Sequence, residues 1–276
     1  MTQTFDIDRL GAILRAAALA EIMPRFRRLG AGDIRQKSSA IDLVTEADEA
    51  AERFIMAECA TAFPGATFVG EESVAADPRL IAKVGTDDLV IVVDPIDGTA
   101  NFAAGAPVFA VMAAVVAGGE TIAGLIYDPM GDDFVQAVKG GGAQLKQADG
   151  TNTDLHVAPP VPLGEMVGVG SHSSIPEAQK REFMARLSAV KVLGNYRCAG
   201  QEYRLAATGN LHFNLYQNLM PWDHLAGALI LTEAGGFVRR LDGSPYLPSH
   251  VDGGLLCASD EASWRSLHGA VYPALG

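Results

Sequence analysis

The sequence is poor in cysteine, tryptophan and basic residues. Its 276 residues include three cysteines and two tryptophans, and 33 acidic residues outnumber 21 lysines and arginines, for a formal net charge of −12. Cys59, Cys198 and Cys257 are too widely spaced for a zinc site or a disulfide framework, so they suit a reducing compartment. The acidity argues against a protein that binds nucleic acid through phosphate contacts. It does not exclude an anionic small molecule, because bound cations can reverse the local sign of charge.

Long apolar runs are also missing. No stretch reaches the roughly 18 residues that a membrane span needs, and the N-terminus lacks the basic and apolar segments of a secretory signal. The composition, with 49% hydrophobic and 20% charged residues, is that of a globular protein. We therefore expect a cytoplasmic protein with no membrane partner and no nucleic-acid partner.

The order of predicted elements divides the chain into two halves, 1–147 and 148–276, with a proline-rich seam at 147–164. In the first half, the pattern predicts two helices, at 6–29 and 46–63, and a loop at 74–86. It also predicts mostly antiparallel strands at 67–70, 89–102, 108–119, 120–129 and 134–139. In the second half, short strands alternate with helices at 174–187, 199–208 and 223–234. This predicts an α+β protein with an antiparallel sheet in the first half and a mixed α/β sheet in the second.

One stretch concentrates the chemistry. The apolar run 89–93 predicts a buried strand, which ends in Asp94-Pro-Ile-Asp97-Gly98. Two carboxylates at the end of a buried strand are costly without a cation, because burial and repulsion both disfavour their charges. Pro95 stiffens the backbone between them, and Gly98 permits a turn that a side chain would hinder. The pattern predicts that Asp94 and Asp97 bind divalent metal ions.

Three other carboxylates fall at the boundaries of predicted elements. Glu71 follows a short strand, Asp48 stands three residues after Thr45, and Asp223 begins a predicted helix. Each has an alternative interpretation: Glu71 as an exposed loop residue, Asp48 as part of a helix cap and Asp223 as an N-cap. All three offer the oxygen ligands that Mg²⁺ prefers, and the residues alone leave both interpretations open.

Two glycine-containing segments are candidates for phosphate binding. The turn that begins at Gly98 and Thr99 can open a helix, and free N–H groups at such an end suit a phosphate. The run Gly140-Gly141-Gly142 lacks the Lys-Ser/Thr of a phosphate-binding loop, so we interpret it as a hairpin turn.

Four motifs together resemble the inositol monophosphatase family of magnesium-dependent, lithium-sensitive sugar phosphatases. In chain order they are Lys37-Ser-Ser-Ala-Ile-Asp-Leu-Val-Thr-Glu-Ala-Asp48, Gly70-Glu-Glu-Ser73, Asp94-Pro-Ile-Asp-Gly-Thr-Ala-Asn-Phe102, and Trp222-Asp-His-Leu-Ala-Gly followed by Thr232-Glu-Ala-Gly-Gly236. The resemblance covers nearly the whole chain. It implies a layered α-β-α-β-α sugar-phosphatase fold, a homodimer, and a phosphoric monoester hydrolase that uses two to three Mg²⁺ ions.

The resemblance also implies roles for individual residues. The implied metal ligands are Glu71, Asp94, the carbonyl of Ile96 and Thr99 for one ion, Asp94, Asp97 and Asp223 for a second, and Glu71 through waters for a third. The implied catalytic residues are Glu71, Thr99, Asp48 and Lys37. Thr99 and Asp48 would act as a dyad that activates a water for direct attack on phosphorus, without a phosphoenzyme. Lys37 would lie on a loop near the site.

Substrate selection is implied to come from the second half. Inositol-preferring members carry a glutamate a few residues before the Trp-Asp motif, and the matching position here is Tyr216. An aromatic residue there removes an acceptor for polyol hydroxyls and adds a stacking face, although Tyr216 can also be interpreted as a strand residue facing the core. The stretch 197–204 also departs from the small-residue pattern of the family. The expected substrate contacts are Gly98, Thr99, Gly200, Tyr216 and Asp223.

The leading function is therefore hydrolysis of a small polyol phosphate such as inositol monophosphate by metal-activated water. The alternatives within the same class are histidinol phosphate, a nucleotide phosphate or another sugar phosphate. A function of a different class is also implied, because some bacterial members of the family are regulatory proteins that bind the transcription machinery.

Overall fold

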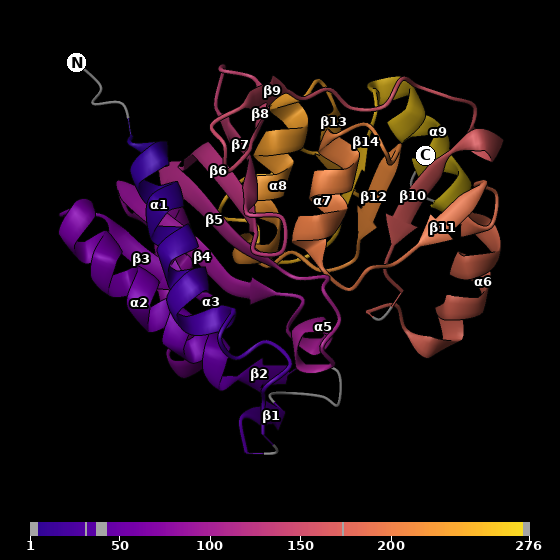
Figure 1. Ribbon diagram of the computed structural model, residues 1–276. Helices are drawn as coiled ribbons and strands as arrows, with labels where there is room; N and C mark the ends of the chain where they lie inside the picture. The colour runs from indigo at the N-terminus through magenta and orange to yellow at the C-terminus, as the bar shows by residue number, and fades with distance from the viewer. Residues whose placement is uncertain (1–4, 31, 37–42, 173, 273–276) are drawn as a thin grey trace.

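The computed structural model describes residues 5–30, 32–36, 43–172 and 174–272. Helices and sheets alternate in five layers (Figure 1). The layers are α1 (Ile7–Ala17) with α2 (Glu46–Ala62), a seven-stranded sheet, α7 (Ala199–Ala207) with α8 (Pro221–Glu233), a five-stranded sheet, and α6 (Glu177–Leu187) with α9 (Glu261–Val271). This confirms the predicted layered α-β-α-β-α fold. Within the described ranges, no helix is both long and apolar enough to cross a bilayer.

The larger sheet belongs to the first part of the chain and has the strand order β3-β4-β5-β6-β7-β8-β9. Its strands are β3 (Thr67–Gly70), β4 (Leu89–Asp97), β5 (Ala110–Ala117), β6 (Glu120–Asp128), β7 (Asp133–Val138), β8 (Ala143–Lys146) and β9 (Asn152–Asp154). Only the β3–β4 pair is parallel, and all later pairs are antiparallel. A separate hairpin of β1 (Ile34–Gln36) and β2 (Leu43–Thr45) precedes α2.

The smaller sheet has the order β11-β10-β12-β14-β13. Its strands are β10 (Val167–Gly170), β11 (Val192–Gly194), β12 (Phe213–Tyr216), β13 (Phe237–Arg240) and β14 (Leu255–Ala258). Strands β11, β10 and β12 are mutually parallel, whereas β14 is antiparallel to β12 and β13, so the sheet is mixed, as predicted. The carboxyl ends of three adjacent parallel strands therefore meet at one edge, where ligands commonly bind in α/β sheets.

Strand β4 shows why the two cores form on opposite faces of the larger sheet. Val90 and Val92 pack against α7 and α8, whereas Ile91 and Val93 pack against α1 and α2. Alternate residues of a strand face opposite sides, so an unbroken apolar run suits a strand that is covered on both faces. The chain crosses between the sheets after β9. The division into halves at 147/148 stays a prediction about folding units.

Some local expectations need correction. The helix predicted for 6–29 ends earlier, because α1 continues only as a π-helical turn at Ala18–Ile22, before Pro24, whose missing N–H disfavours a longer helix. The loop predicted for 74–86 is wrong. That segment forms short helices: α3 (Glu71–Ala76), a 3₁₀ turn at Pro78–Ala82 and α4 (Lys83–Thr86). Helices of one or two turns are too short to show a helical period in the sequence.

The glycine run is confirmed as a hairpin turn between β7 and β8. The backbone N–H groups of Gly140 and Gly142 donate to the carboxylate of Glu233 on α8, at 2.8 and 2.9 Å. These amides therefore bind a carboxylate of the chain itself, and the turn ties α8 to the larger sheet.

Candidate active site

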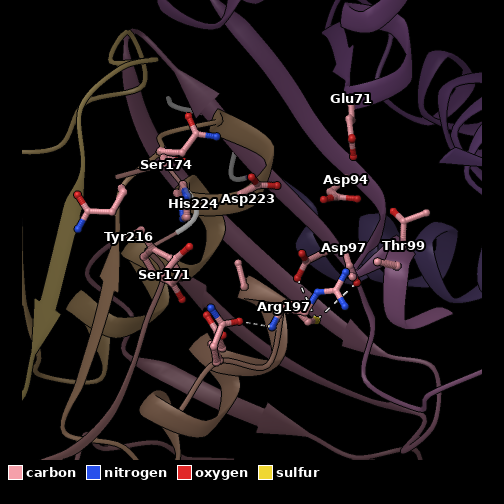
Figure 2. A pocket seen from close by; sticks show the side chains of 18 of the residues that line it. Glu71, Asp94, Asp97, Thr99, Ser171, Ser174, Arg197, Tyr216, Asp223 and His224 are labelled. Carbon is pink, nitrogen blue, oxygen red and sulfur yellow. Dashed lines mark hydrogen bonds between the residues drawn. The ribbon is translucent and has the colours of Figure 1, made fainter. Parts of the chain in front are cut away.

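A cavity of about 620 Å³ opens where the end of β4 faces the carboxyl ends of β10, β11 and β12. The first part of the chain contributes Glu71, Asp94, Asp97 and Thr99 to its wall, and the later part contributes Asp223. Figure 2 shows the labelled carboxylates directed into this cavity from different elements. The structure therefore brings together most of the residues that the sequence predicted for the site.

An irregularity in β4 lets Asp94 and Asp97 share one side of the sheet. Residues three apart in a regular strand point to opposite faces, but the pairing of β4 with β5 shifts register between these two aspartates. Pro95 has no N–H to give to the ladder, and the N–H of Ile96 donates to the Asp94 side chain at 3.0 Å. Both carboxylates consequently reach the cavity, and both are at most 8% exposed.

The turn after Asp97 depends on Gly98. Its φ of 89° lies in the left-handed region, and a Cβ there would stand 2.9 Å from the carbonyl oxygen of Val108. The turn leads directly into α5 (Thr99–Ala103), so Thr99 begins a helix at the cavity wall, as the sequence predicted.

Asp223 comes from a later element of the chain, helix α8. Met220 is the N-cap residue of this helix, so Asp223 lies inside the first turn and the N-cap interpretation is wrong. Single oxygen atoms of Asp94, Asp97 and Asp223 lie within 4.8 Å of one another. Strand β4 of the larger sheet and helix α8 therefore converge on one group of three carboxylates.

Glu71 is the first residue of α3, and a buried glutamate holds that helix in place. Glu52 on α2 accepts hydrogen bonds from the N–H of Glu72 at 2.7 Å and of Ser73 at 2.8 Å, and from the Ser73 hydroxyl. A Cβ at Gly70 would collide with the Glu52 carboxylate. Glu52 thus acts as the cap of α3 and sets the start of the helix that carries Glu71.

Asp48 has the helix-capping role that the sequence left open, and it also contacts Thr99. It completes the predicted capping box at the start of α2, in which the N–H of Thr45 donates to Asp48 Oδ2 at 2.9 Å. Its other oxygen, Oδ1, lies 3.1 Å from the hydroxyl of Thr99, which is also 3.0 Å from the carbonyl oxygen of Ile96. The fully buried Asp48 therefore reaches the cavity only through Thr99.

Asp97 is tied to the later part of the chain by the start of α7. The N–H of Gly200 donates to Asp97 Oδ2 at 2.5 Å, and the thiol of Cys198 donates to the same atom at 3.1 Å. The N–H of Gly200, an expected substrate contact, thus donates to an aspartate. The contact of Cys198 with Asp97 was not predicted from the sequence.

Burial and crowding raise the pKa of the carboxyl groups of Asp94, Asp97 and Asp48. Burial is the largest cause for Asp94, followed by the charges of Glu71 and Asp97. Burial raises the pKa of Asp97 to about 6, against the lowering effect of the Gly200 N–H, and raises that of Asp48 to about 7, against the Thr45 hydroxyl. A cation bound close to such a carboxyl group stabilises its ionised form. An all-oxygen donor set suits a hard divalent ion, so the residues present fit Mg²⁺.

The later wall of the cavity is polar and comes from the loops that follow β10, β11 and β12. Tyr216 at the end of β12 lines the cavity yet is 7% exposed, and its hydroxyl accepts from Asn214 Nδ2 at 3.1 Å. Glu202 on α7 is buried behind it, and burial raises its pKa to about 7. Tyr216 therefore belongs both to the core and to the cavity.

Two buried glutamates were missed from the sequence, Glu52 and Glu202. Each occupies an apolar helix face: Glu52 lies between Ala51 and Ile55 on α2, and Glu202 lies beside Tyr203 on α7. An acidic residue at a position that the helical pattern places on the buried face is the sequence feature that could have identified them. Lys37 lies outside the described residues.

Known proteins are similar to this chain in sequence over most of its length, and solved structures share its fold. A sequence model described as the inositol monophosphatase family matches residues 9–275. The chain is 35% identical over 243 residues to an inositol-1-monophosphatase from Mesorhizobium japonicum, covering 85% of this chain and 84% of that protein. It is 28% identical over 274 residues to the Nus factor SuhB of Haemophilus influenzae, with 97% of each covered. The structure of an IMPase from Thermotoga maritima matches with a TM-score of 0.79 and 24% identity, covering 98% of this chain and 99% of that one.

Proposed function

The chain belongs to the inositol monophosphatase family and is a phosphoric monoester hydrolase, and on that premise we propose that it hydrolyses a small phosphorylated polyol with Mg²⁺. The observation that carries this proposal is the convergence of Asp94, Asp97 and Asp223, whose oxygens lie within 4.8 Å of one another in a cavity large enough for a small substrate. A site of this kind acts on phosphate esters by positioning and by charge neutralisation.

The proposed metal ligands follow from the donor set. They are Glu71, Asp94, the carbonyl of Ile96 and Thr99 for one ion, and Asp94, Asp97 and Asp223 for a second, with a third near Glu71. When bound, such ions would neutralise the charge of the phosphate and lower the pKa of a water molecule toward neutrality.

Thr99 and Asp48 are proposed to orient the attacking water. The Thr99 hydroxyl has one proton and two acceptors in reach, Asp48 Oδ1 at 3.1 Å and the Ile96 carbonyl at 3.0 Å. When it donates to Asp48, its lone pairs are free to accept a hydrogen bond from the water. Asp48 can then hold a proton at Oδ1, because burial raises its pKa to about 7 and a base is most useful near the working pH.

The phosphate is proposed to contact the backbone N–H groups of Gly98 and Thr99, where α5 begins. Asp223, on α8, would hold a water that protonates the leaving alkoxide. Tyr216 lies on the later wall of the cavity, which fits its proposed contact with the leaving group. Gly200, whose N–H donates to Asp97, is retained as a proposed contact from the family resemblance alone. Lys37 is retained as a proposed catalytic residue from the family resemblance alone.

Phosphate release from a substrate panel tests the proposal. Inositol, histidinol, fructose and nucleotide monophosphates are compared at fixed Mg²⁺, with and without a chelator. We expect release from at least one member, loss of release on chelation, and recovery on addition of Mg²⁺. Absence of release from every member in the presence of Mg²⁺ would contradict the proposal, and the member with the highest kcat/KM would decide between inositol, histidinol and nucleotide phosphates.

Other expectations rest on the resemblance. A regulatory role in transcription is suggested by the names of relatives such as the H. influenzae Nus factor SuhB, and no contact in the described cavity favours it over catalysis. Homodimerisation and a cytoplasmic location stay predictions. Light scattering of the purified chain would test the first.

A further inference from the structure

The later wall of the cavity contains a single lysine or arginine among its described residues, Arg197. It stands in the loop between β11 and α7, and Figure 2 shows its side chain extending into the cavity. The loop follows the carboxyl end of a parallel strand, the position from which α/β sheets commonly contact a ligand. Because phosphate is proposed to bind near β4, the remainder of a substrate would extend toward this wall.

The backbone of Arg197 is held in an uncommon conformation. Its φ is 55°, a left-handed value that is rare for residues other than glycine and that persists where the surroundings enforce it. The Arg197 N–H donates to Asn195 Oδ1 at 2.9 Å and also faces the Glu202 carboxylate. Glu202, 6% exposed, accepts a second bond from the N–H of Tyr196 at 2.8 Å. A buried carboxylate thus fixes the loop that presents Arg197.

Two other non-glycine residues with positive φ provide a comparison, and the side chain of each has a partner. Arg27, with φ 59°, donates to the carbonyl of Gly105 at 2.9 Å. Asp132, with φ 54°, pairs with Arg15 and accepts from Tyr127. For the exposed guanidinium of Arg197, no hydrogen bond or ion pair is formed with any residue of the described ranges. The strained backbone therefore presents a cation that the described part of the chain does not use.

The rest of this wall suits a charged substrate better than a neutral polyol. Glu202 is occupied by backbone N–H groups, and the Tyr216 hydroxyl is engaged by Asn214. In the described part of the wall that α7 and the three loops form, Glu202 is the one carboxylate, so no carboxylate is left there to accept from the hydroxyls of a polyol. A guanidinium, by contrast, matches the two oxygens of a carboxylate or phosphate with two parallel N–H bonds.

We propose that Arg197 binds a second anionic group, a carboxylate or a phosphate, on the leaving-group side of the phosphomonoester substrate. This inference rests on the proposed phosphatase function and narrows its substrate class. It makes Arg197 a residue that determines specificity, because its contact lies on the part of the substrate that differs between phosphomonoesters.

Two matched pairs of compounds test the inference and distinguish the two anions. Glycerol 3-phosphate and 3-phosphoglycerate differ by a carboxylate in place of a hydroxymethyl group. Fructose 1-phosphate and fructose 1,6-bisphosphate differ by a second phosphate. We expect the wild-type protein with Mg²⁺ to have a higher kcat/KM for the more anionic member of at least one pair, and the pair that shows the preference identifies the anion.

The variant Arg197→Gln is expected to lower kcat/KM for the preferred, more anionic compound by roughly tenfold to a hundredfold, the size of a lost charge-assisted hydrogen bond. The kcat/KM for the less anionic member of the same pair should change less than about twofold. Arg197→Lys keeps the positive charge but loses the planar guanidinium, so its kcat/KM for the more anionic compound should lie between the values of the wild-type protein and Arg197→Gln. Arg181→Gln removes another exposed arginine, on the outer helix α6, and should change neither compound.

Equal losses for both members of each pair would overturn the inference, because Arg197 would then contact the group common to all substrates. No loss for either member would overturn it as well. Binding of the same pairs to wild-type and Arg197→Gln protein, measured by titration calorimetry with Mg²⁺, separates this from the phosphatase proposal. Selective binding without phosphate release would leave the anion site standing and remove the proposed hydrolysis.

Discussion

The two walls of the cavity are built in different ways. The wall from the first part of the chain includes the nearly fully buried carboxylates of Asp94 and Asp97, at the end of a strand inside the large sheet. The wall from the later part consists of loop residues after β10, β11 and β12, among which Arg197 is exposed. The first wall has its geometry fixed by the core, and the second has contacts that can change without disturbing that core.

This difference separates the chemistry from the choice of substrate. Groups that act on phosphorus must be held in place before the substrate arrives, and burial between strands and helices provides that. Groups that contact the leaving part of the substrate need only reach it, and loops on a rigid scaffold do so. Variants in the first wall should therefore affect every substrate, whereas variants in the second should affect substrates selectively.

The largest effect is expected for Asp94→Asn, which tests the first wall directly. The asparagine keeps the shape of the side chain and the acceptor for the Ile96 N–H. It removes the negative charge that is proposed to bind both metal ions. We expect phosphate release to fall about a thousandfold for every substrate, while the melting temperature is kept or raised, because a buried charge is removed. Asp149→Asn, in the exposed β8–β9 turn, is the control. A loss of phosphate release for only some substrates would contradict the view that the first wall acts on all of them alike.

A smaller effect is expected for Glu52→Gln, which tests whether the first wall depends on support behind it. A glutamine would turn an NH₂ group toward N–H donors of α3 that now meet a carboxylate. We expect the Mg²⁺ concentration for half-maximal activity to rise roughly tenfold to a hundredfold, as for other residues that orient ligands. Glu58→Gln, on the exposed face of the same helix, should leave it unchanged. Equal metal requirements in both variants would contradict the role of Glu52.

The pH dependence of the metal-free protein tests the burial of the carboxylates. Burial raises the pKa of Asp48 to about 7 and of Asp97 to about 6, above the values of the unfolded chain. Between pH 4 and 7 the folded state thus keeps protons that the unfolded state has released, so stability falls as pH rises. We expect the chelated protein to melt about 5 °C lower at pH 8 than at pH 5, and Mg²⁺ to reduce that difference. A chelated protein that is more stable at pH 8 would contradict this reasoning.

The sequence predicted the first wall better than the second, for a physical reason. The strand that ends in Asp94 and Asp97 and the capping box of Thr45 and Asp48 are encoded by neighbouring residues, and the structure contains both. The loop around Arg197 owes its conformation to Glu202, which sequence patterns present as an ordinary helix acid. Burial of such a residue is decided by the packing of distant elements, which a local pattern does not contain.

The fold shows the same limit. Continuous apolar runs predicted β4 and the hairpins, because a strand that is covered on both faces has apolar residues at successive positions. The segment 74–86 was wrongly expected to be a loop, since α3 and α4 are too short for a periodic pattern. The five-layer arrangement came from the family resemblance, because the order of strands in a sheet depends on contacts far apart in the chain. The assignment of individual metal ligands stays a prediction.

The smallest effect is expected where the two walls meet, at Cys198. Its thiol donates to Asp97 at 3.1 Å, so a residue of the later wall helps to orient a carboxylate of the first. Because a thiol is a weak donor, Cys198→Ala should raise the Mg²⁺ concentration for half-maximal activity only about threefold, and Cys198→Ser, with a stronger donor, should not raise it. Cys59→Ala removes a thiol buried in the other core and serves as the control. If alanine and serine behave alike, the later wall does not orient Asp97, and the walls are more independent than their contact suggests.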